Sequence, residues 1–91
     1  MNNHLSEKDT KALLNILVEQ LGVQAEQLTP DARIYEDLGA DSLTVIEIVM
    51  AVEERFSLSI PDEESEKVST VEDLFETIAR LLEPSNARAV R

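Results

Sequence analysis

The sequence predicts an all-α protein, a small helical bundle of three main helices plus one short helix. Its 91 residues are enough for one domain with one hydrophobic core. Only three residues are aromatic, and the apolar content is mostly Leu, Val, Ile and Ala, which suits packed helices better than a β-sandwich. Three segments repeat apolar residues at helical spacing, so we expect helices and no sheet.

The first helix is delimited by a capping residue and a glycine. Ser6, followed three residues later by Asp9, predicts its start. Gly22 predicts its end, because glycine adopts the left-handed conformation that closes helices. The apolar residues between them recur at helical spacing: Leu13, Leu14, Leu17, Val18 and Leu21. Residues 23–40 then form a connection that is long for so small a domain, and such loops are usually functional or packed by their own side chains.

A second helix is predicted from Leu43 to Phe56, because Asp41 and Ser42 are both favourable N-caps. Pro61 and the three acids that follow it predict a short helix of one or two turns.

The last helix is predicted to open with Ser69 and Glu72, which have the spacing of a capping box. Its apolar residues recur at intervals of three and four residues, and Pro84 is expected to end this helix. The predicted domain therefore covers residues 6–82, and we expect residues 1–5 and 83–91 to be flexible termini.

Two different apolar faces are predicted for the second helix. The core face holds Val45, Val49, Val52 and Phe56, flanked by Ile46 and Ile48. The opposite face holds Leu43, Glu47, Met50 and Glu54. Either a loop buries the leucine and the methionine, or the face is a docking strip whose carboxylates steer a basic partner.

The charge distribution favours a docking function. The net charge is −11, and residues 31–66 hold eleven acidic but only two basic residues. Concentrated charge costs stability through self-repulsion, and steering a partner is a reason to tolerate that cost. The same charge argues against binding to nucleic acid or to an anionic membrane surface.

The absence of cysteine excludes disulfides, thiolate metal sites and cysteine nucleophiles. No apolar run is long enough for a membrane helix, and the N-terminus lacks the form of a signal peptide. We therefore expect a cytoplasmic protein and a monomer. The acidic clusters also lack the ligand spacing of a calcium-binding loop, so we expect no defined metal site.

Ser42 is the residue at which chemistry is most plausible. It lies at the predicted start of a helix, where unsatisfied N–H groups and the helix dipole favour a phosphate ester, although position alone favours a simple N-cap role. A hydrolase is disfavoured, because a serine nucleophile needs a base and the only histidine is His4, ahead of the first helix.

Residues 36–54 then carry a family resemblance. The run EDLGADSL, followed by VIEIVMAVEE, resembles the bacterial acyl carrier protein of type II fatty-acid synthesis. The similarity continues through IPDEE and STVED and covers nearly the whole predicted domain.

The resemblance implies that Ser42 carries 4′-phosphopantetheine, derived from coenzyme A and attached by a holo-acyl-carrier synthase that recognises Asp41. Acyl groups are then carried as thioesters on the thiol of this arm, so the protein is a carrier and not an enzyme. Basic patches on ketosynthases, reductases, dehydratases and acyltransferases are expected to bind the docking face, formed by Leu43, Glu47, Met50, Ala51, Glu53 and Glu54. The acyl pocket of the family corresponds to Ile34, Val52, Ile60, Val68 and Leu74, for which plain core packing is an equal explanation.

Three positions depart from the family pattern. Thr44 and Arg55 stand where acids are usual, and Tyr35 places an aromatic hydroxyl in the loop. These departures leave a dedicated carrier for a polyketide or specialised lipid as an alternative to primary fatty-acid synthesis. A cofactor-free acidic adaptor with the same bundle is the alternative from another class.

Overall fold

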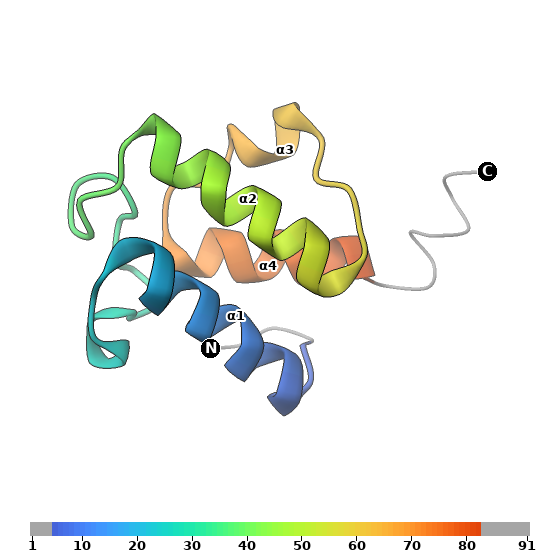
Figure 1. Cartoon of the computed structure of the whole chain (residues 1–91), viewed down its shortest axis with the longest axis horizontal. Coiled ribbons are helices and arrows are strands. Elements are labelled where there is room, and N and C mark those ends of the chain that lie inside the picture. The colour runs from blue at the N-terminus through green and yellow to red at the C-terminus, as the bar shows by residue number, and fades with distance from the viewer. Residues whose placement is uncertain (1–4, 83–91) are drawn as a thin grey trace.

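The computed structural model describes residues 5–82, and these residues form a helical bundle without strands. The helices are α1 (Glu7–Leu21), the 3-10 turn η1 (Ala25–Gln27), α2 (Ser42–Phe56), α3 (Asp62–Ser65) and α4 (Val71–Leu82). In Figure 1, α2 crosses in front of α4, with α1 on one side and the short α3 on the other. Both the predicted all-α class and the three-plus-one arrangement are confirmed. The predicted flexibility of residues 1–4 and 83–91, like the role of Pro84, lies outside the described residues.

The ends of α1 are set by the residues that the sequence indicates. The Ser6 hydroxyl oxygen accepts a hydrogen bond from the Asp9 N–H at 3.1 Å. Gly22 closes the helix with a φ of 68°, and its N–H donates to the Val18 carbonyl.

The start of α4 is one residue later than the sequence indicates. Its hydroxyl cap is Thr70, which accepts from the Asp73 N–H at 3.1 Å, and Asp73 in turn accepts from the N–H groups of Ser69 and Thr70. The predicted Ser69–Glu72 box is therefore wrong. A tertiary contact sets this register, because the Ser69 carbonyl accepts from the Ile34 N–H and is held against the loop.

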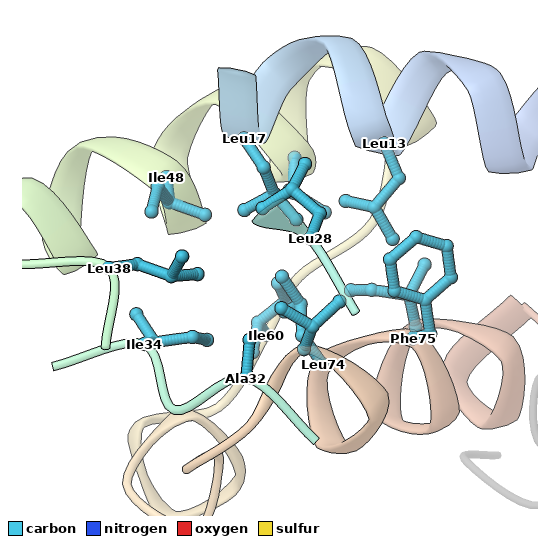
Figure 2. Packing of buried hydrophobic residues seen from close by; sticks show 13 residues of the cluster. Leu13, Leu17, Leu28, Ala32, Ile34, Leu38, Ile48, Ile60, Leu74 and Phe75 are labelled. Carbon is cyan, nitrogen blue, oxygen red and sulfur yellow. The ribbon is translucent and has the colours of Figure 1, made fainter. Parts of the chain in front are cut away.

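The long connection packs into the core through its own side chains. Leu28, Ala32, Ile34 and Leu38 are all buried between α1, α2 and α4 (Figure 2). Backbone hydrogen bonds tie residues 30–34 to residues 69–72, with one isolated antiparallel bridge between Arg33 and Thr70. This packing fixes the chain that leads into α2.

Candidate functional site

Ser42 is the first residue of α2 and is exposed. The N-cap is its neighbour Asp41, whose Oδ1 accepts hydrogen bonds from the N–H and the Oγ1 of Thr44, both at 2.9 Å. Among residues 5–82, the Ser42 hydroxyl has no hydrogen-bond partner. Since the capping is done by Asp41, the alternative explanation of Ser42 as the N-cap is wrong, and its hydroxyl is available for another role.

The hydrogen bonds from Thr44 lower the pKa of Asp41, the backbone N–H having the largest effect. Asp41 is therefore a carboxylate at neutral pH, held at the helix terminus where the positive end of the helix dipole favours an anion. Thr44 thus fixes the orientation of the Asp41 carboxylate, directly before Ser42 in the chain.

The turn before Ser42 is held by an arginine–aspartate contact. The Oδ2 of Asp37 accepts from the backbone N–H of Arg33 at 2.9 Å and from its Nε at 3.3 Å, and Oδ1 accepts from Nη2 at 3.2 Å. These bonds lower the pKa of Asp37, chiefly through the backbone N–H. Gly39 then turns with a φ of 75°, and the Ala40 N–H donates to the Ile34 carbonyl. The backbone that presents Ser42 is therefore well anchored.

The outer face of α2 is apolar as well as acidic. Leu43 is 63% exposed and Met50 62%, so their burial against a loop, the first of the two explanations for this face, is wrong. Ile46 is 53% exposed, and its predicted place beside the core is also wrong. It lies about 60° from Leu43 around the helix, at the boundary between the two faces. Glu47 and Glu54 are exposed along the same face.

A shallow, open depression lies beside this face. Its lining residues are Gln20, Glu47, Met50, Ala51, Glu53 and Glu54. Every residue of the predicted docking face except Leu43 therefore lines one acidic hollow, to which α1 adds Gln20.

Glu53 differs from the other acids of the hollow. Its Oε2 accepts a hydrogen bond from the Ile60 N–H at 2.7 Å, in a half-buried position. This carboxylate therefore has a role within the fold, because it holds the chain that returns from α2 towards α3. The side chain of Glu54, its exposed neighbour, has no hydrogen bond or ion pair in the described part of the chain.

An apolar cavity of about 20 Å³ lies on the inner side of α2. Its lining residues are Ile34, Val45, Ile48, Val49, Ile60, Ser65, Val68, Leu74 and Thr77. Four of the five predicted pocket residues are among them, whereas Val52 is fully buried and does not line the cavity. Sequence reasoning placed Val45, Ile48 and Val49 only in the core, and it did not single out Ser65 or Thr77.

The cavity and Ser42 lie close together on α2. Val45 lines the cavity and is three residues after Ser42, which is a rise of about 4.5 Å along the helix axis and a rotation of about 60°. A flexible group attached to Ser42 therefore starts within one helical turn of the cavity.

The site fits a phosphate ester. The Ser42 hydroxyl is exposed and unbonded, and the first-turn N–H groups of a helix lack intrahelical partners and favour a negative charge. Within residues 5–82 there is no group of three or more His, Asp or Glu side chains placed to hold a metal ion. None of the described helices is long and apolar enough to cross a membrane.

The bundle presents an unbonded serine at the head of an acidic helix, beside a small apolar cavity, and this arrangement fits a carrier domain. The family described as "Phosphopantetheine attachment site" matches residues 11–78. The chain is 50% identical over 68 residues to an acyl carrier protein of Syntrophobacter fumaroxidans, covering 75% of this chain and 84% of that protein. It is 58% identical over 59 residues to an acyl carrier protein of Helicobacter hepaticus, covering 65% of this chain and 78% of that protein. The chain belongs to the acyl carrier protein family.

Proposed function

We propose that this protein carries acyl groups as thioesters on a 4′-phosphopantetheine arm attached to the Oγ of Ser42. The observation that carries the proposal is the exposed, unbonded hydroxyl of Ser42 at the head of α2, directly after the capping residue Asp41. When attached, the arm supplies a thiol, which this cysteine-free chain does not have. The protein's own residues present the arm and bind the partners, so its role is that of a non-catalytic carrier.

The docking surface of the proposal is the outer face of α2. Leu43, Ile46 and Met50 supply exposed apolar area, and Glu47 and Glu54 supply exposed negative charge beside it. Such a surface suits a basic patch with an apolar centre, on which charge steers the encounter and apolar contact retains the partner. The expected partners are the holo-acyl-carrier synthase, which also recognises Asp41, and the ketosynthases, reductases, dehydratases and acyltransferases of fatty-acid synthesis.

The cavity is the proposed site for the acyl chain. It is almost wholly apolar, it begins within one turn of Ser42, and Ile34, Ile60, Val68 and Leu74 line it. Its volume of about 20 Å³ is room for roughly one water molecule, so the bundle has to expand to admit a hydrocarbon chain. Val52 stays outside this proposal as a core residue.

Attachment of the arm is tested by intact-mass measurement. The apo protein is incubated with a holo-synthase and coenzyme A, and we expect the mass of one phosphopantetheine to be added. Ser42→Ala should add none, and modification that persists in this variant would refute the site. No modification of the native protein would favour the cofactor-free acidic adaptor.

A dedicated carrier for a polyketide or specialised lipid is the second candidate. The observation that favours it is the missing acid at Thr44 and at Arg55 on the docking helix. Comparing turnover of this protein by fatty-acid elongation enzymes with that of a Thr44→Asp/Arg55→Glu variant tests it. Equal turnover would remove the support for a specialised pathway.

A further inference from the structure

Residues 61–68, here called the strap, form one wall of the cavity. They contain α3 and contribute Ser65 and Val68 to its lining. The remaining walls are α2, α4, the loop at Ile34, and Ile60. The helices α1, α2 and α4 each bury side chains in the core, whereas α3 buries none. Only Val68 of the strap packs against the core, and it is half-buried, so the strap is the wall least fixed by core packing.

Both ends of the strap are anchored to the rest of the bundle. At its start, the Ile60 N–H donates to the carboxylate of Glu53 at 2.7 Å. After its end, the Ser69 N–H donates to Asp73 at 3.0 Å, and the Ser69 carbonyl accepts from the Ile34 N–H at 2.9 Å. The strap is thus a segment suspended between two fixed points.

Between these anchors, the backbone hydrogen bonds of the strap stay within it: they join residues 61–68 to one another. Its side chains reach the rest of the described bundle by one polar contact, in which Arg80 Nη2 of α4 donates to Glu64 Oε1 at 2.8 Å. Neither residue lines the cavity, but both are next to its wall, because Glu64 adjoins the lining residue Ser65 and Arg80 is one turn beyond the lining residue Thr77. The hydrogen bond from Arg80 lowers the pKa of Glu64, so the pair is charged at neutral pH.

We propose that the Glu64–Arg80 ion pair is a latch that holds the strap over the cavity and sets how readily an acyl chain enters. The proposal rests on the acyl-carrier function proposed above. Entry requires the cavity to grow well beyond its volume of about 20 Å³, and the strap is the wall that can move. Glu64 and Arg80 are positioning residues, since they act on the cargo through the strap.

The strength of the pair suits a latch that opens. The Arg80 side chain is 50% exposed and that of Glu64 is 20% exposed. Ion pairs near the surface are weak, so breaking this one should favour the open strap by about two- to five-fold. The free energy gained by burying several methylene groups of an acyl chain exceeds the free energy of this ion pair. A very short acyl group buries too little apolar surface to open the strap.

Hydrogen exchange tests the latch in the protein without an acyl group. The variants Glu64→Gln and Arg80→Gln both abolish the attraction between opposite charges, although Glu64→Gln keeps a neutral oxygen acceptor, and they change the net charge in opposite directions. Because α3 is only four residues long, its release from α4 should unwind it and open the hydrogen bonds within the strap, so exchange of the Glu66 and Val68 amides should accelerate about two- to five-fold in both variants. The control Glu63→Gln removes one charge from the same short helix and should leave these rates unchanged. Exchange rates that follow net charge, or that match between Glu63→Gln and Glu64→Gln, would overturn the latch.

Cleavage of the acyl thioester by hydroxylamine tests how the Glu64–Arg80 latch affects entry of the acyl chain into the cavity. With an octanoyl group on the arm, Glu64→Gln and Arg80→Gln should slow cleavage about two- to five-fold relative to Glu63→Gln, because the chain spends more time in the cavity. With an acetyl group, the three variants should react alike. Equal octanoyl rates would overturn the role in cargo entry. Failure of the protein to accept the arm would refute the proposed function instead, and the exchange result would still decide whether the pair holds the strap.

Discussion

Glu53 and Glu54 are adjacent acids on α2 with different physical roles, and exchanging each for alanine separates these roles. Glu53 accepts the half-buried N–H of Ile60 at 2.7 Å, whereas Glu54 is exposed. Glu53→Ala leaves the N–H of a buried residue without its acceptor, and Glu54→Ala removes only a surface charge. Both variants remove one negative charge from the same helix and gain the same helix propensity, so they are matched.

The magnitude follows from the type of bond. A hydrogen bond to a charged group contributes about 1.5–3 kcal/mol, and a buried donor left unsatisfied costs about 1–3 kcal/mol. Both variants remove one negative charge from a chain of net charge −11 and so relieve some repulsion. This stabilisation is about the same in both, so it cancels when their free energies of unfolding are compared. We therefore expect Glu53→Ala to be less stable than Glu54→Ala by about 1–3 kcal/mol. For a domain of this size that difference lowers the thermal midpoint by roughly 5–20 °C.

Thermal and urea unfolding followed by far-ultraviolet circular dichroism measure this difference. Glu53→Gln keeps an oxygen acceptor and should fall between the native protein and Glu53→Ala. Association with a holo-synthase should show the reverse order, because Glu54 is the exposed charge: Glu54→Gln should slow binding more than Glu53→Gln. Equal midpoints for the two alanine variants would refute the structural role of Glu53.

The remaining predictions concern the docking face, added salt and pH. Glu54→Lys should slow association with partner enzymes, with a smaller effect at high salt, whereas Met50→Ala should speed dissociation because it removes contact area; stopped-flow binding measures both. Added salt or millimolar divalent cations should raise the thermal midpoint at neutral pH, since they screen the acidic segment, and a midpoint insensitive to salt would contradict this. Acidification from pH 7 to about 5 should also raise the midpoint by reducing repulsion. Below about pH 4 the midpoint should fall, because the pKa of Asp37 and of Asp41 is lowered in the folded state, so the stability from their hydrogen bonds is present above the unfolded pKa and lost as they protonate.

Local sequence patterns were sufficient to predict most of the fold. Ser6 and Gly22 act on their own neighbours in the chain, so the cap and the stop of α1 could be predicted. The start of α4 could not, because Ser69–Glu72 and Thr70–Asp73 both match a capping pattern. The pairing of Ser69 with Ile34, 35 positions earlier, selects the second one.

The site was predictable where it depends on one helix and not where it depends on several segments. Leu43 and Met50 could be placed on the outer face from the helical period alone. The bond between Glu53 and the Ile60 N–H crosses a turn whose course no periodicity describes. Ser65 and Thr77 line the cavity because α3 folds over α4, which is also a tertiary effect.

Thr44 and Arg55, the departures on the docking helix, both have roles within the fold. Thr44 donates two hydrogen bonds to Asp41 Oδ1, and an aspartate at this position could donate only through its backbone and would add a like charge beside Asp41. The guanidinium of Arg55 lies 5.9 Å from the ring centroid of Phe56, near the end of α2, where a positive charge is favoured by the helix dipole. Each departure therefore stabilises one end of α2. Because each also stands in place of an acid, it makes the helix less negative. Fold stability is therefore a second explanation for both departures beside a change of partner, and the exposed acids Glu47 and Glu54 still provide the steering charge between the two ends.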